Sequence, residues 1–293
     1  MADTPSEGAL AKLALDSVLP FDTSSIPFEF TSENLRMVQT HLQTGGIRGS
    51  RQRRSHRVRI GTEQITGTIA MQPSKTELDW LLPYILYGST SVGVTSLAEA
   101  VAEFQVMVDR VAKVFTYAGC RVGRATFAGA MGQPLTLSLD IEGETESIGN
   151  AGTFPAITID TGTMAIFSDI TLTLQGSART VKSFQLVIDH MLDTGRYLNS
   201  VTRSEIPSQD LQVTLSVVVP YTPDNTDLLD QAIAGAAGTL AWTFDSSTYT
   251  WAMGNVKAPS ESPGVAGKSE IDLTLNMEAF HDGTNPVIKC TKS

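Results

Sequence analysis

The chain has 293 residues, of which 41% are hydrophobic and 18% are charged. It is long enough for one large domain or two ordinary ones with real cores. A net charge of −10 argues against a general nucleic-acid-binding surface. The sequence has no apolar run of about 18 residues, so we expect no membrane span. It also has no secretory signature, so we do not expect an oxidising compartment. Cys120 and Cys290 are too few for a disulfide framework, although a single bridge stays open.

The first 35 residues are expected to form an N-terminal arm, either lying on a neighbouring molecule or fraying. They include a possible short helix at residues 9–18. A strand is predicted over residues 34–42, and residues 65–72 alternate apolar and polar side chains as a half-buried strand does. The glycine-rich, arginine-dense segment between these two strands is expected to be a long loop.

A helix is predicted directly after Pro73. Ser74 can cap the first turn, and Glu77 three residues later completes a capping box. Pro83 should kink or break the helix, because proline removes a backbone donor and clashes with the preceding turn. The side expected to be buried carries Leu78, Leu81, Leu82 and Ile85.

Strand patterns dominate the rest of the chain. A second helix is possible at residues 96–104, and residues 146–155 form the best candidate for a domain boundary. Further strands are predicted over residues 106–109, 113–119, 134–142, 169–175, 183–189, 211–219, 239–244, 248–254 and 270–278, and a loop over 257–267. The expected fold is mainly antiparallel β, with a β-sandwich or barrel segment and one packed helix in each half.

An internal repeat supports two similar halves. Shifting the sequence by 150 positions aligns identical residues, and strand 135–142 later matches 271–278 at a shorter offset. We interpret this as a duplication, with an arm at 1–35 and domains at 36–150 and 151–293. The identical pairs include Leu42 with Leu192, Thr44 with Thr194, Arg53 with Arg203, Pro73 with Pro223 and Gly88 with Gly238.

The sequence shows no motif for catalysis, metal binding or phosphate binding. Asp189 and His190 point to opposite faces of a strand, so we interpret them as ordinary surface groups. His281 and Asp282 precede a glycine and are expected to form a turn. We therefore expect no enzyme activity, no metal and no cofactor.

Six arginines fall within one twelve-residue run, which leaves 15 basic against 31 acidic residues elsewhere. Such a run is typical of a contact with an acidic protein surface, including another copy of the same chain. Nucleic-acid binding and a plain solvated loop remain alternatives. The lack of aromatic residues between the arginines counts against nucleic-acid binding. The arginines are Arg48, Arg51, Arg53, Arg54, Arg57 and Arg59.

The matching strands 135–142 and 271–278 each place apolar residues on one face and polar residues on the other. The polar face can be an ordinary solvated sheet surface or the wall of an aqueous channel. Its acidic members are Asp140, Glu142, Asp272 and Glu278.

The stretch at residues 59–88, RIGTEQITGTIAMQPSKTELDWLLPYILYG, and its echo at 203–235 resemble the tail tube proteins of long-tailed bacteriophages, specifically the type with a duplicated tube domain. The resemblance implies that sheets from six domains join into a barrel around a lumen, with the helix outside. Two domains per chain then imply three chains per ring. The four acidic residues would face the lumen and repel DNA, and the arginine loop would contact the next ring. The second half lacks the arginine cluster, so the two loops need not be equivalent.

The resemblance also implies the partners and the location. Homotrimeric rings, or alternatively homohexameric ones, would stack into a tube in the virion tail after assembly in the host cytoplasm. The lumen would hold the tape measure protein and the linear genomic DNA, and tail terminator and tail-tip proteins would bind the ends. Two alternatives remain at this point: a capsid-decorating or host-binding β-sandwich of the virion, and a monomeric β-barrel that binds a small molecule.

Overall fold

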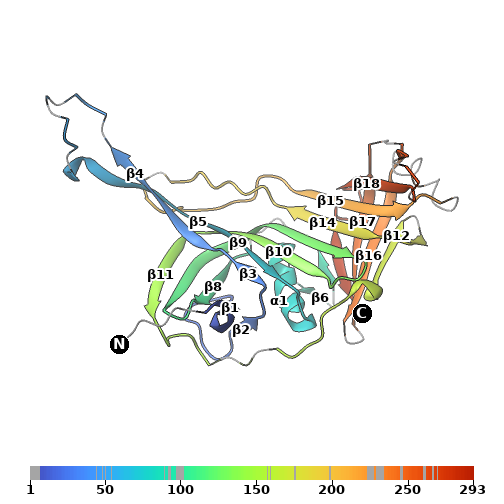
Figure 1. Ribbon diagram of the computed structural model, residues 1–293, viewed down its shortest axis with the longest axis horizontal. Coiled ribbons are helices and arrows are strands. Elements are labelled where there is room, and N and C mark those ends of the chain that lie inside the picture. Colours follow the sequence, from blue (N-terminus) through green and yellow to red (C-terminus); the bar gives the residue numbers. More distant parts are fainter. Residues whose placement is uncertain are drawn as a thin grey trace.

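The computed structural model describes residues 7–293 except 44, 48, 50, 54, 89, 92, 93, 97–101, 157, 159, 175, 198, 223–227, 229–233, 245, 246, 260, 261, 266 and 269. The described residues form a mainly antiparallel β structure, which confirms the predicted fold class. Figure 1 shows a two-layered body from which the hairpin of β4 and β5 projects.

A small sheet forms the lower layer of the body in Figure 1. Its order is β2, β1, β8, β9 and β11, and every pairing is antiparallel. Only the first part of β9 belongs to this sheet, because residues 121–130 of the same long strand continue into the large sheet. The bounds are β1 (Lys12–Asp16), β2 (Ile26–Phe28), β8 (Phe104–Asp109), β9 (Lys113–Ala130) and β11 (Thr145–Asn150).

The prediction of a helix at residues 9–18 is wrong. A 3-10 turn, η1 (Gly8–Leu10), leads directly into β1. Leu13 and Leu15 of β1 lie opposite valines of β8 and are fully buried. Pairing with β8 therefore outweighs the weak helical preference of this short segment.

The large sheet runs in the order β4, β5, β10, β9, β14, β15, β18, β17, β16, β12 and β13. β18 pairs with β17 only at its last residues, 278–280. The bounds are β4 (Arg36–Gln43), β5 (Val58–Met71), β10 (Thr136–Gly143), β14 (Ser183–Asp189), β15 (Gln212–Pro220), β18 (Asp272–Phe280), β17 (Ser247–Lys257), β16 (Ala236–Phe244), β12 (Ile170–Leu174) and β13 (Ser177–Arg179).

Short elements complete the chain. β3 (Ser32–Glu33) pairs with β5, and β19 (Lys289–Lys292) pairs with both β17 and β7 (Val94–Ser96). β6 (Thr90–Ser91) pairs with β7. Two further 3-10 turns are η2 (Ser55–Arg57) and η3 (Phe167–Asp169).

The strand order repeats, so the repeat seen in the sequence has a counterpart in the strand pairings. The set β4–β5–β10–β9 has the same pairings as β14–β15–β18–β17, and β1–β8 corresponds to β12–β16. We call β1–β11 the first unit and β12–β19 the second unit. Glu142 lies opposite Thr66 just as Glu278 lies opposite Thr214. This register relates β5 to β15 by 148 positions, two fewer than the offset of 150 found in the sequence.

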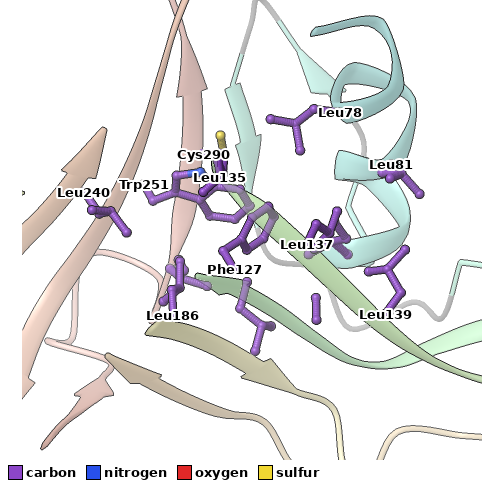
Figure 2. Packing of buried hydrophobic residues seen from close by; sticks show 14 of the residues in the cluster. Leu78, Leu81, Phe127, Leu135, Leu137, Leu139, Leu186, Leu240, Trp251 and Cys290 are labelled. Atoms are coloured by element: carbon purple, nitrogen blue, oxygen red, sulfur yellow. The ribbon is translucent and has the colours of Figure 1, made fainter. Parts of the chain in front are cut away.

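β9 and β14 join the two units edge to edge. Seven residue pairs form the junction, from Ser183 opposite Ala130 to Asp189 opposite Arg124. Beneath it the two units share one core, in which the Phe127 and Trp251 ring centroids lie 4.9 Å apart. Figure 2 shows these rings beside Leu186 of β14, with leucines of the helix on the other side.

The helix α1 (Lys75–Ile85) confirms the predicted cap and the predicted buried face. Ser74 Oγ accepts from the Glu77 amide at 3.3 Å, and a Glu77 carboxylate oxygen accepts from the Ser74 amide at 2.8 Å. Pro83 does not break the helix in its middle, because only two helical residues follow it. All four leucine and isoleucine positions predicted for the inner face are buried.

Two other helix predictions fall mainly outside the described residues. Of the possible helix at 96–104, residues 97–101 are not described, and Phe104 already begins β8. The packed helix expected in the second half falls mainly on residues 223–233, of which Leu228 is described and is buried in the shared core.

Gly67 lets the chain cross β5 closely. A Cβ at Gly67 would lie 2.4 Å from the Leu35 Cα and 2.7 Å from its nitrogen, both rigid backbone atoms. The glycine therefore permits the segment before β4 to pack against β5.

Candidate functional site: a basic hairpin and a polar sheet face

The basic hairpin consists of β4, the first part of β5 and the residues between them, 36–64. It projects from the body at the upper left of Figure 1. Arg51, Arg53, Arg57 and Arg59 are all exposed on it, whereas Arg48 and Arg54 lie outside the described residues. Arg53 donates to the Gln43 side chain at 3.3 Å. This placement keeps the described arginines available for another molecule.

Apolar side chains accompany the arginines on this hairpin. Leu42, Val58 and Ile60 are 64%, 38% and 49% exposed. All eight residues of β4 are exposed, although β4 is a regular strand. Exposed apolar residues on a projecting strand pair are typical of a surface that a partner covers.

The second unit has an equivalent hairpin, which lies against the body. We call residues 190–211 the second hairpin. It crosses β9 and β5 within their lengths, where the His190 amide donates to the Gly123 carbonyl and the Glu63 amide donates to the Val201 carbonyl, each at 2.8 Å. Leu192 bridges to Ser208 within it, as Leu42 pairs with Arg59 in the basic hairpin.

Arg203 anchors the second hairpin to the first unit. Its side chain is buried and forms a salt bridge with Glu142 of β10. Its Nε donates to the Tyr197 hydroxyl at 2.8 Å, and its Nη1 also donates to the Ile65 carbonyl at 3.4 Å. Glu142 additionally accepts from the Thr66 hydroxyl at 2.8 Å. The pair thus links the polar face of the first unit to a loop of the second.

The interpretation of His190 as a surface group is wrong. The imidazole is buried, stacks on Tyr87 with ring centroids 3.7 Å apart, and its Nε2 lies 2.7 Å from the Ile85 carbonyl oxygen. Burial lowers the pKa of His190, because the charged form loses its hydration. Since the strand ends at Asp189, the alternation of faces no longer applies to His190. The turn expected at His281 and Asp282 is confirmed by bonds to following amides.

The four predicted carboxylates lie on the face of the large sheet opposite the core. They alternate with buried apolar residues of β10 and β18, and Figure 1 places α1 on the other side of β10. Each has a partner in the sheet: Asp140 accepts from Thr68 at 2.8 Å, Glu142 from Thr66, Asp272 from Lys182 at 2.5 Å and Glu278 from Gln212 at 3.2 Å.

Basic residues on the same face neutralise part of its negative charge. Arg124 pairs with Asp189 at 2.6 Å across the β9–β14 junction, and Lys182 pairs with Asp272 and Glu270. The Asp272 and Glu270 carboxylates raise the pKa of Lys182. The sequence pattern did not reveal these pairs, because their members lie far apart in the chain.

The described residues offer no other evident chemical site. They contain no cluster of three potential metal ligands and no helix long and apolar enough to cross a membrane. Cys120 and Cys290 are both free thiols, and burial raises the pKa of each. The possible single disulfide between them is therefore not formed.

Comparison with known proteins identifies the family. No curated protein matches the chain significantly. The family model described as phage tail tube protein matches residues 18–279, most of both units. The chain therefore belongs to the phage tail tube protein family and is a structural protein of a bacteriophage tail.

Proposed function

We propose that this protein polymerises as stacked rings into the tail tube that encloses the channel for genome DNA. The observation that carries the proposal is the β9–β14 junction, where the sheet of one unit continues into the sheet of the next. Because the two units share a strand order, the same edge-to-edge pairing can join one chain to another. Closing the sheet into a ring removes exposed strand edges.

The edges that remain in one chain match this scheme. β14 pairs with both β15 and β9, whereas its first-unit counterpart β4 pairs only with β5 among the described residues. At the other end, β18 pairs with β15 along its length but with β17 only at residues 278–280. An outer edge of β4 on one chain would meet the β17–β18 end of another.

Two units per chain suggest three chains in a pseudo-sixfold ring. The repeated strand order supports tube domains at 36–150 and 151–293. In the proposed arm, residues 1–35, the strands β1 and β2 already pair with β8 or with each other. They therefore add to the first unit's sheet.

Asp140, Glu142, Asp272 and Glu278 would face the lumen of this ring. Their face lies opposite α1, which would place the helix on the outside of the tube. A polar, partly acidic wall repels DNA phosphates and lets the genome pass without adhering. The tape measure protein and genomic DNA would occupy the lumen, with terminator and tip proteins at the tube ends.

The arginines of the basic hairpin would contribute to contacts between successive rings. Exposed ion pairs are each worth only about 0–1 kcal/mol, but they recur in every chain. Tube elongation should therefore weaken with salt, since the Debye length falls from about 10 Å at 0.1 M to about 3 Å at 1 M. Elongation that is unchanged over this range would contradict an ionic contact between rings.

Electron microscopy of the purified full chain at increasing concentration tests the proposal. The expected result is tubes whose reconstruction has three chains and six similar lobes per ring. Globular particles at every concentration would refute polymerisation by the chain itself, and six whole chains per ring would refute the stoichiometry.

A further inference from the structure

A hollow beside β18 in the second unit has a counterpart in the first unit that is filled. The hollow has a volume of about 650 Å³. Its lining includes Lys257, Pro259, Glu278 and Phe280, from the end of β17, the residues after it and β18. Phe280 is 42% exposed there, which is unusual for a large aromatic side chain.

The repeated register identifies the first-unit equivalents of this lining. Glu278 lies opposite Lys257 in the second unit, and Glu142 lies opposite Arg121 in the first. Each residue of the second-unit pair comes 136 positions after its first-unit counterpart. The same offset makes Pro259 the counterpart of Gly123. In the first unit, these positions are covered by the second hairpin.

Two contacts define how the second hairpin covers them. Arg203 forms its salt bridge with Glu142. The Leu192 side chain packs on Gly123, where an added Cβ would lie 3.5 Å from Leu192 Cδ1. The hairpin thus supplies one cation and one apolar side chain to the end of the first unit's sheet.

The basic hairpin carries the same two residues at matching positions. Leu42 and Arg53 precede Leu192 and Arg203 by 150 positions, and both are exposed. Leu42 and Leu192 also occupy similar places in their hairpins, since Leu42 pairs with Arg59 and Leu192 bridges to Ser208. However, the basic hairpin lies at the opposite end of the molecule from β18 in Figure 1. It cannot fill the hollow of its own chain.

We propose that the hollow beside β18 receives the basic hairpin of a second copy, in which Arg53 pairs with Glu278 and Leu42 packs on Pro259. The proposal rests on ring assembly and specifies the lateral partner of the hairpin within the ring. Among the described residues Glu278 forms no salt bridge, whereas its counterpart Glu142 has Arg203. Arg51, Arg57 and Arg59 flank Arg53 and stay available for the next ring.

Engineered disulfides test the contact directly. The double variant Arg53→Cys with Glu278→Cys should, on mild oxidation of assembled protein, give covalent species of two and three chains. Each single variant should remain at one chain, because Cys120 and Cys290 are buried in the fold. A ladder beyond three chains would overturn the proposal, since the link would then run from ring to ring.

Charge reversal provides a second test. Arg53→Glu should raise the concentration needed for assembly by about tenfold, equivalent to about 1.4 kcal/mol, and adding Glu278→Arg should restore it. Arg57→Glu is the matched control, because Glu278→Arg should not rescue it. If the wild-type chain forms tubes but neither the disulfide nor the rescue appears, the lateral contact alone is refuted. If the wild-type chain forms no assembly, ring formation fails with it.

Discussion

Replacing Arg203 by methionine tests whether the second hairpin is held to the first unit by a buried charge. The arginine side chain is 2% exposed, and its partner Glu142 is 23% exposed. Removing one member of a buried pair costs about 3–5 kcal/mol, because the other charge is left without compensation. Glu142 keeps the Thr66 hydroxyl and some water, so we expect a smaller loss of about 2–3 kcal/mol.

This loss corresponds to a measurable shift in thermal stability. Unfolding entropy of about 2.1 cal/mol/K per residue gives about 0.6 kcal/mol/K for a chain of this length, and hence a Tm lower by about 3–5 °C. Differential scanning calorimetry would measure the shift. Methionine keeps an unbranched apolar stem like that of arginine, so part of the packing is preserved.

Arg196→Met is the matched control in the same hairpin. Arg196 pairs with Asp193 and Glu205, but its side chain is 48% exposed. Its replacement should change the free energy of unfolding by no more than about 0.5 kcal/mol. Equal shifts for the two variants, or no shift for Arg203→Met, would refute the assignment of Arg203 as the anchor.

Three further outcomes follow from the fold. Gly67→Ala should lower the free energy of unfolding by about 2–4 kcal/mol in chemical denaturation, because the added Cβ meets the Leu35 backbone. Gly264→Ala, at an exposed glycine, should leave stability unchanged. Similar values for the two variants would contradict the close crossing. Leu186→Ala, which removes a buried side chain opposite Phe127, should cost about 2–5 kcal/mol and keep a single unfolding transition; two separated transitions would show that the units unfold independently. For His190, whose pKa is lowered by burial, stability should fall as pH drops below about 6.5, because the unfolded chain binds a proton that the fold resists; His190→Gln should flatten this dependence, and an unchanged slope would count against it.

Local patterns in the sequence determined the elements that depend on nearby residues. The cap of α1 and its buried face follow from residues within three turns of each other, so Ser74, Glu77 and Leu78 were predicted as found. The alternation along β10 and β18 likewise placed Asp140 and Asp272 opposite the core. The internal repeat was visible because identical residues recur at a nearly constant spacing.

Only the tertiary structure decided which strands meet and which side chains are buried by distant partners. β1 is a strand because β8 lies beside it, more than eighty residues later. His190 is buried by Tyr87, and Arg203 by Glu142 and Ile65, all from the other unit. In the internal repeat of the sequence, Arg53 and Arg203 align with each other. Their surroundings differ because a single chain contains one junction between units, so the second hairpin is covered by the first unit whereas the basic hairpin is exposed.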